Sequence, residues 1–201
     1  MPRRSLPLAL VFSCLLTGCS PRDFLTRRLA ADLIAASPSF KTAQEFWLRI
    51  GVISNKEYIS PEYLVLQHAG WISGTPAKCP PAVAPPPCWD VVLTPIGVET
   101  FRDLIASSDV GKSYFRVSTA RRELVSITGI SKNANLADVD FIWKWVPLNE
   151  VGDALYAGGV QYKSTVAFKH YDDGWRVVEG SSPAKNVQDL EDALKNPEPA
   201  Q

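Results

Sequence analysis

An alternation of apolar and polar residues in the second half of the chain constrains the fold most. From Ala137 to Trp145 every second residue is apolar, and Asp138, Asp140 and Lys144 lie between them. Side chains of a strand point alternately to its two faces, so this pattern predicts a half-buried antiparallel strand over residues 137–146. Similar patterns predict strands at residues 114–119, 124–130, 160–171 and 175–179. Asp172-Asp173-Gly174 is typical of a hairpin turn between the last two. The sequence thus predicts a four- to five-stranded antiparallel meander.

The first half has helical periodicity instead. Leu25, Leu29, Leu33 and Ala36 share one face of a helix that we expect from Pro21 to Ser37. Thr42-Ala43-Gln44-Glu45 reads as a capping box, which predicts a second helix as far as Ile50. Further helices are expected at residues 61–69, after Thr94-Pro95 and around residues 187–194, with short strands at 71–73 and 89–93. The predicted fold class is α+β.

The N-terminus carries an export signal. Arg3 and Arg4 precede an apolar run, Leu6 to Leu16, which is shorter than the ~20 residues that span a bilayer. Leu16-Thr17-Gly18-Cys19 resembles the lipobox of bacterial lipoproteins. This resemblance implies removal of residues 1–18, acylation of Cys19 and a lasting membrane anchor. Ser20, where an Asp would favour retention in the inner membrane, implies the outer membrane, facing the periplasm. The alternative is a secreted protein in which Cys19 is structural.

The remaining cysteines are expected to form a disulfide. With Cys14 removed and Cys19 acylated, only Cys79 and Cys88 are left, in an oxidising compartment where disulfides persist. Five of the eight residues between them are proline, so the bridge would close a stiff loop. A redox or metal site is the alternative, but it lacks a Cys-x-x-Cys spacing and a nearby His. We expect no metal and no cofactor.

Charge argues against nucleic acid as a partner. Loss of Arg3 and Arg4 with the signal would leave 19 of the 21 basic residues against 21 acidic ones. Nucleic-acid binding depends mainly on Lys and Arg that neutralise phosphates, so a slightly acidic chain is a poor candidate. An apolar content of 46% with six Trp indicates a packed globular protein.

Two segments resemble the winged helix of bacterial regulators. They are the run from Tyr63 to Ile72, which is similar to the last helix, and Val92 to Gly97, which is similar to the second wing strand. The resemblance extends over residues 40–107 and implies a winged-helix-like region. A recognition helix offers Arg, Lys, Asn or Gln to DNA, whereas residues 61–69 contain neither Arg nor Lys. We therefore expect an interaction scaffold.

The end of the sheet resembles another group of folds. Phe168 to Val177 is similar to the terminal hairpin of cone-shaped sheets in the SnoaL and ketosteroid isomerase superfamily, and to cystatin-like sheets. The cone fold implies an apolar pocket that is catalytic or only binds. No residues here match the Asp and Tyr pair of the enzymes, and no local motif of a hydrolase, metalloprotease or nucleotide-binding protein occurs. We assign no catalytic residue.

A few side chains are candidates for ligand or proton binding. His170 is one, because Asp172 and Asp173 are close enough in sequence to raise its proton affinity. Tyr156 and Tyr162 flank Gly158-Gly159 and could act in recognition. Five of the six tryptophans are expected in the core, with Trp89 packed on the disulfide; these are Trp47, Trp71, Trp89, Trp143 and Trp145.

These inferences divide the chain into five regions. They are a signal peptide (1–18), a lipidated anchor with the first helix (19–38), a winged-helix-like region (39–109), an antiparallel sheet (110–181), and a short helix with a loose tail (182–201). The leading functional hypothesis is a non-enzymatic, membrane-anchored envelope protein that binds another envelope protein. The alternative is a small-molecule binder or isomerase-type enzyme that uses a cone-shaped pocket.

Overall fold

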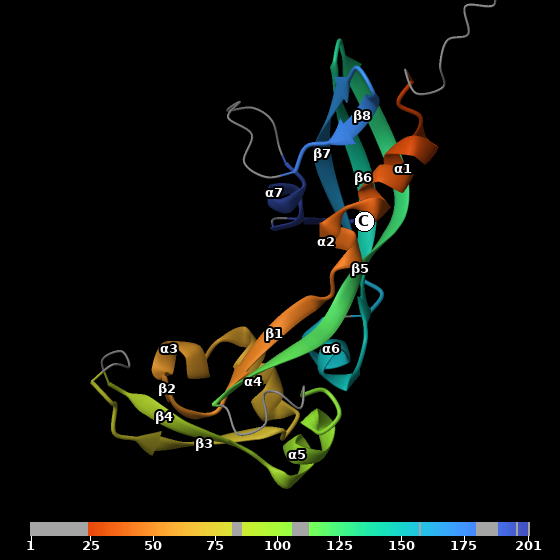
Figure 1. The fold of residues 1–201 in the computed structure, drawn as a ribbon. Coiled ribbons are helices and arrows are strands. Elements are labelled where there is room, and N and C mark those ends of the chain that lie inside the picture. Colours follow the sequence, from red (N-terminus) through yellow and green to blue (C-terminus); the bar gives the residue numbers. More distant parts are fainter. Residues whose placement is uncertain are drawn as a thin grey trace, which may run out of the picture.

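A computed structural model describes residues 24–81, 86–105, 113–156, 158–179, 189–195 and 197–200. The lipobox and the predicted signal peptide lie outside these residues. Figure 1 shows two lobes joined by the long strand β5 (Tyr114–Asn133), and we call them the upper and the lower lobe after this view. The fold is mixed α and β with a large antiparallel sheet, which confirms the coarse prediction.

The large sheet has six strands in the order β1-β5-β6-β7-β8, with β9 also paired to β7. Besides β5, they are β1 (Gln44–Arg49), β6 (Leu136–Pro147), β7 (Gln161–Tyr171), β8 (Gly174–Val177) and β9 (Glu198–Pro199). The alternation in β6 is confirmed, because Ala137, Val139, Phe141 and Trp143 are all buried. The predicted β7–β8 hairpin is also present, and Gly174 at its turn has a φ of 125°, which favours glycine.

Two strands predicted at residues 114–119 and 124–130 are one strand. The charged residues Arg121 to Glu123 look like a break, but none of them is a turn-forming residue, and all three pair with β6. Irregularity occurs later, as register shifts between Leu124 and Ser126 and between Ile127 and Gly129. Such bulges bend a strand without ending it. The sheet therefore has fewer turns and a longer central strand than predicted.

A small antiparallel sheet of order β2-β4-β3 organises the lower lobe. Its strands are β2 (Gly51–Ser54), β3 (Ile72–Ala77) and β4 (Cys88–Leu93), and its helices are α3 (Asn55–Tyr58), α4 (Pro61–His68) and α5 (Pro95–Phe101). The predictions for α4, α5, β3 and β4 are confirmed to within a few residues. Thr94 caps α5 through its side chain, which accepts a hydrogen bond from the Gly97 N–H at 3.0 Å.

The predicted helix over residues 42–50 is wrong, because this segment forms β1. Gln44 to Arg49 pair with residues 114–120 of β5. Leu48 is fully buried and Phe46 packs against the same core, whereas Trp47 points to the other side and is exposed. The apolar residues Phe46 and Leu48 thus follow a period of two. Pairing with a distant strand outweighs the local capping signal.

The ends of the described chain also differ from expectation. Helix α1 (Arg27–Ala36) begins at Arg27, with Thr26 as its N-cap, and the predicted start at Pro21 lies outside the described residues. It is followed by a short helix, α2 (Pro38–Lys41). Helix α7 (Leu190–Lys195) matches the last predicted helix, but the tail predicted to be loose forms β9 against Tyr162 and Lys163. No described helix is long and apolar enough to cross a membrane.

Each lobe has its own hydrophobic core. In the upper lobe α1, α2 and α7 cover one face of β5 to β8 around Ile34, Phe141 and Phe168. In the lower lobe the small sheet, α4 and α6 (Glu150–Leu155) pack on β1 and the start of β5 around Leu48 and Phe115. Strand β1, from the region predicted at 39–109, therefore belongs to the large sheet.

Candidate interaction surface

His170 and Asp172 lie at the upper end of the large sheet but do not form the expected pair. The ring of His170 packs edge-on against Trp175 with 5.0 Å between centroids. Its Nε2 atom is buried and has no hydrogen-bond partner among the described residues. Asp173 bonds to Arg176, and Asp172 is exposed at the turn. The structure thus places Asp173 against Arg176 and leaves Asp172 exposed to solvent. His170 packs against an aromatic ring.

Tyr156 and Tyr162 belong to one row of aromatic rings. Tyr156 lies 4.7 Å from Trp145, Trp145 lies 5.3 Å from Trp143, and Trp143 stacks on Tyr162 at 4.9 Å, all measured between centroids. Trp143 is fully buried, and its Nε1 donates to Ser164 Oγ at 3.1 Å. The expectation that Trp143 is a core residue is confirmed. The two tyrosines are half-buried at the ends of this row.

Arg122 lies against the same rings at the junction between the lobes. Its guanidinium carbon is 4.5 Å from the Trp145 centroid and 5.6 Å from that of Trp143, and Nη1 donates to the Ser39 carbonyl at 3.0 Å. Burial lowers the pKa of Arg122 and raises the pKa of Tyr156. Within the described chain Arg122 has no carboxylate partner, and its Nε is buried and unbonded. This contact ties α2 to the sheet and borders an open hollow of about 360 Å³ beneath α1.

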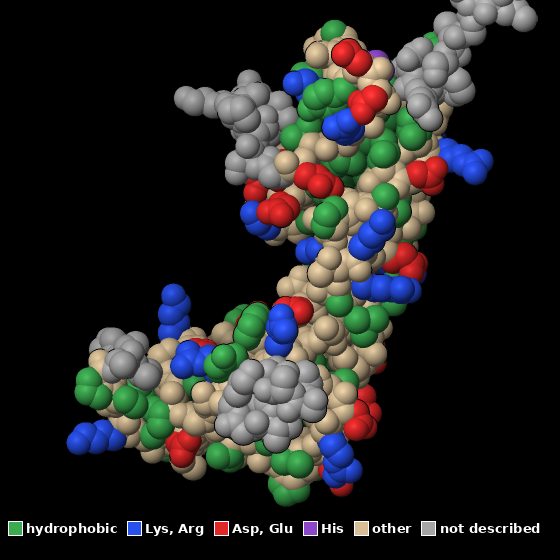
Figure 2. Space-filling view, in the orientation of Figure 1, with side chains coloured by type: hydrophobic (Ala, Val, Ile, Leu, Met, Phe, Trp, Pro, Cys, Tyr) green, Lys and Arg blue, Asp and Glu red, His purple; other side chains and the backbone are tan. Residues whose placement is uncertain are grey.

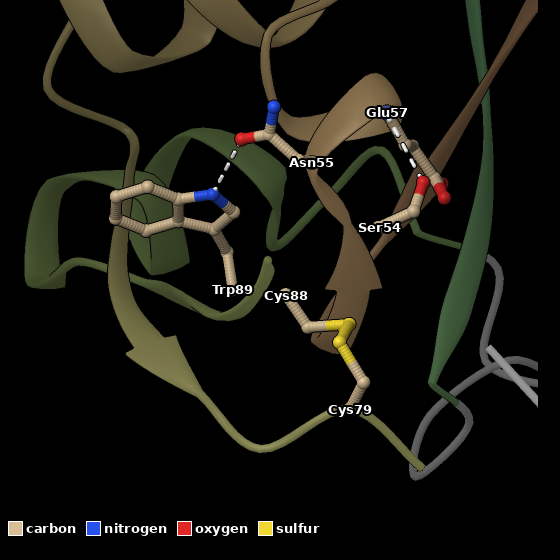
Figure 3. The surroundings of a disulfide bond; sticks show 6 residues. All are labelled: Ser54, Asn55, Glu57, Cys79, Cys88 and Trp89. Carbon is tan, nitrogen blue, oxygen red and sulfur yellow. Dashed lines mark hydrogen bonds between the residues drawn. A yellow bond between two sulfur atoms is a disulfide. The ribbon is translucent and has the colours of Figure 1, made fainter. Parts of the chain in front are cut away.

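Cys79 and Cys88 are bonded, as predicted. Their Cα atoms are 5.3 Å apart, and the bond joins Cys79, two residues after the end of β3, to the first residue of β4 (Figure 3). Trp89, expected to pack on the disulfide, instead stacks on Tyr58 at 4.4 Å and donates from Nε1 to Asn55 Oδ1 at 2.9 Å. Neighbouring residues of a strand point to opposite faces, which separates the Trp89 ring from the sulfur atoms.

The outer face of the β1–β5 pair carries a surface that the sequence did not indicate. Trp47 is 53% exposed, and its ring lies 6.0 Å from that of Tyr114, which is also exposed. The guanidinium of Arg116 lies 5.7 Å from the Trp47 centroid and pairs with Glu45 at 3.8 Å. Arg49, next along the same face, bonds to Glu57 at 3.0 Å. We call Trp47, Arg49, Tyr114 and Arg116 the Trp47 surface.

The Trp47 surface is not evident from the sequence, because the capping box at Thr42 predicts a helix with Trp47 on its core side. The signal was the alternation of Glu45, Trp47 and Arg49 with Phe46 and Leu48. In a strand this pattern places Trp47 among charged neighbours, away from the core.

A hollow of about 460 Å³ adjoins the Trp47 surface through Arg116. It is lined by residues of the β1–β5 pair and by the turn after α5, namely Glu45, Arg116, Ser118, Asp103, Leu104 and Ile105. Acidic, basic and apolar side chains share this lining. Among the described residues, no group of three His, Cys, Asp or Glu side chains is placed to hold a metal ion. The Trp47 surface offers two aromatic rings and two guanidinium groups, each of which is paired with a carboxylate, and these groups are suited to contact with another molecule.

Comparison with known proteins adds no relative. No family model matches the chain, and no curated protein or solved structure shows significant similarity to it.

Proposed function

We propose that this protein is a bacterial envelope lipoprotein, anchored through Cys19 in the outer membrane, that binds a protein partner in the periplasm without catalysing a reaction. The observation that carries the proposal is the Trp47 surface. Trp, Tyr and Arg are the residues most enriched among those that dominate binding energy at protein interfaces. Here one Trp, one Tyr and two Arg lie on a single sheet face, with both rings about half exposed.

The lower lobe supports a finer proposal, that it is a winged-helix-like scaffold. Its small sheet has the order β2-β4-β3, α3 and α4 precede β3, and the disulfide-closed loop joins β3 to β4 in the place of a wing. The exposed residues of α4 include Glu62, Leu64 and His68 but no Lys or Arg. A protein partner suits this helix better than DNA does, because DNA recognition needs basic side chains.

The alternative function, a small-molecule binder or isomerase with a cone-shaped pocket, has weaker support. Phe141 and Trp143 are fully buried on the inner face of the sheet and occupy the place that a cone pocket would need. One observation favours it, namely the open hollow beside Arg122, whose cation has no acidic partner in the described chain. A screen for anionic metabolites that raise the melting temperature of the wild type but not of Arg122→Met would support this function.

Anchoring is tested on the protein isolated from its own envelope. Mass analysis should find an acylated Cys19 at the N-terminus, and the protein should float with membranes on a density gradient. Cys19→Ala should be recovered as an uncleaved or soluble form. Flotation of Cys19→Ala to the same extent as the wild type would rule out the lipobox as the anchor.

Binding is tested by photo-crosslinking in intact cells. A photoreactive residue at Ser118, an exposed neighbour of the Trp47 surface, should give a defined crosslinked product. The same residue at Val125, which is exposed on the upper part of β5, serves as the matched control. Trp47→Ala should reduce the Ser118 product at least tenfold, since truncation of such an anchor costs about 2 kcal/mol. Equal products from Ser118 with and without Trp47, or from both positions, would contradict the proposal.

A further inference from the structure

Exposed apolar side chains gather at the upper end of the large sheet, far from the Trp47 surface. Three elements meet there: the start of the described chain, the turn between β5 and β6, and the turn between β7 and β8 (Figure 1). Phe24, Leu136 and Tyr171 are 57%, 37% and 43% exposed. Figure 2 shows hydrophobic, basic and acidic side chains side by side at this end. We call Phe24, Lys132, Leu136, Lys169, Tyr171 and Arg176 the tip.

Cations lie on the aromatic rings of the tip. Lys132 Nζ is 5.6 Å from the centroid of Phe24 and 5.9 Å from that of Trp175. Lys169 and Arg176 each lie 5.2 Å from the ring of Tyr171. Side chains of this kind, an apolar body next to a positive group, are typical of membrane–water interfaces, where rings enter the headgroup layer and cations meet phosphates.

The charge at this end has a basic excess. Residues 24–28, 130–138 and 168–177 form this end, and they carry five basic side chains, namely Arg27, Arg28, Lys132, Lys169 and Arg176. The same three segments carry three acidic side chains, namely Asp138, Asp172 and Asp173, and Asp173 bonds to Arg176. The whole chain is neutral, so this local excess is a property of the tip. It fits an anionic lipid surface better than a neutral one.

The anchor and the tip are close in the chain. Phe24 follows Cys19 by five residues, which can reach at most about 18 Å. An acyl group on Cys19 sits in the bilayer, so a lipid surface is the one partner that the chain itself would hold within reach of the tip. This step rests on the proposed anchoring at Cys19.

We propose that the tip docks on the anionic surface of the bilayer in which Cys19 is anchored. The sheet then stands away from the membrane, and the Trp47 surface lies at its far end. Arg116 and Lys132 are separated by 16 residues of β5, or about 50 Å at the rise of a strand. The upper lobe is thus the spacer that presents the lower lobe to partners in the periplasm.

The test uses the full acylated protein in vesicles of phosphatidylethanolamine and phosphatidylglycerol. Leu136→Cys at the tip and Val92→Cys on the lower lobe are labelled with an environment-sensitive fluorophore, while Cys79 and Cys88 stay protected in their disulfide. Spin-labelled lipids that quench at headgroup depth should quench the Leu136→Cys label at least threefold more than the Val92→Cys label. Equal quenching, or stronger quenching of the Val92→Cys label, would overturn the proposal.

A second experiment tests whether docking depends on the basic side chains of the tip or is nonspecific contact of the protein with the vesicle surface. Lys169→Ala should lower the ratio of docked to undocked protein about fivefold, because one basic group near an anionic surface contributes about that factor. Lys56→Ala, which removes an exposed charge from α3 in the lower lobe, should leave the ratio unchanged. If the tip docked on another protein instead, docking would persist in phosphatidylcholine vesicles and would require added extract. That result would also overturn the lipid assignment.

Failure of anchoring and failure of docking give different results. If Cys19 is not acylated, the protein does not float with the vesicles and the proposed function itself fails. If it floats but the tip label is not quenched, the anchor stands and the docking proposal is wrong.

Discussion

The hydroxyl group of Tyr63 joins α4 to β1, and its removal tests how the lower lobe is held together. It accepts a hydrogen bond from the Arg49 N–H at 2.7 Å and donates one to the Arg49 carbonyl at 3.0 Å. Tyr63 is 3% exposed, and its ring packs edge-on against Phe46. Tyr63→Phe keeps the ring and leaves two backbone groups without their partner. At about 1 kcal/mol for each hydrogen bond, the variant should lose about 2 kcal/mol of unfolding free energy at pH 8.

The same contact makes the stability of the wild type depend on alkaline pH. Burial raises the pKa of Tyr63 to about 12, against about 10 in the unfolded chain. Because the unfolded chain loses this proton first, the native state binds more protons between these values, and stability falls as pH rises. The contribution is complete below pH ~10 and is lost as pH rises through ~12. At pH 11 the expected loss is about 1.4 kcal/mol.

Tyr63→Phe lacks this titration, so the unfolding free energies of the two proteins should converge as pH rises. The difference in unfolding free energy, about 2 kcal/mol at pH 8, should fall below about 1 kcal/mol at pH 11. The measurement is urea denaturation followed by tryptophan fluorescence without reductant. Tyr171→Phe, which changes an exposed hydroxyl, is the control and should stay parallel to the wild type. A difference for Tyr63→Phe that is constant from pH 8 to pH 11 would refute the reasoning.

Three further changes test the packing of the lower lobe. Gly152→Ala would bring a Cβ within 1.9 Å of the Thr119 carbonyl oxygen, so it should cost about 3 kcal/mol and lower the melting temperature, whereas Gly158→Ala, with nothing within 4 Å, should leave it unchanged. Leu48→Ala should cost about 3 kcal/mol in urea denaturation and Trp47→Ala less than about 1, and the reverse order would contradict the assignment of β1. Reduction of the disulfide, which joins residues nine apart, should lower stability by about 2 kcal/mol, measured as a urea midpoint with and without reductant.

The sequence predicted elements whose signals are long or purely local. Strand β6 carries its alternation from Ala137 to Trp145, the β7–β8 turn needs only Asp172-Asp173-Gly174, and α5 begins at a Thr-Pro pair. The disulfide followed from counting cysteines. In each case the information lies within one segment, and nothing distant competes with it.

Elements whose conformation depends on pairing with residues distant in the sequence were not predicted. Thr42 and Glu45 have the right spacing for a capping box, yet Gln44 to Arg49 pair with a strand some seventy residues later. The exposure of Trp47 follows only from that pairing, because the pairing with β5 decides which face of β1 packs on the core. The contact of Arg122 with Trp143 and Trp145 likewise joins residues that are neighbours only through the β5–β6 register. Candidate sites chosen from sequence neighbours, such as His170 with Asp172, had no such information.

Strand β5 gives the two proposed surfaces a fixed relationship. Its first residues belong to the lower core through Phe115 and Val117, and Ile127, further along, belongs to the upper core. Between them Arg122 bonds to Ser39 and Ser118 accepts a hydrogen bond from Asn149, so neighbouring segments brace β5 between the two cores. A continuous, braced strand transmits orientation from one lobe to the other. Docking of the tip would therefore set the direction in which the Trp47 surface faces, without any contact between that surface and the membrane.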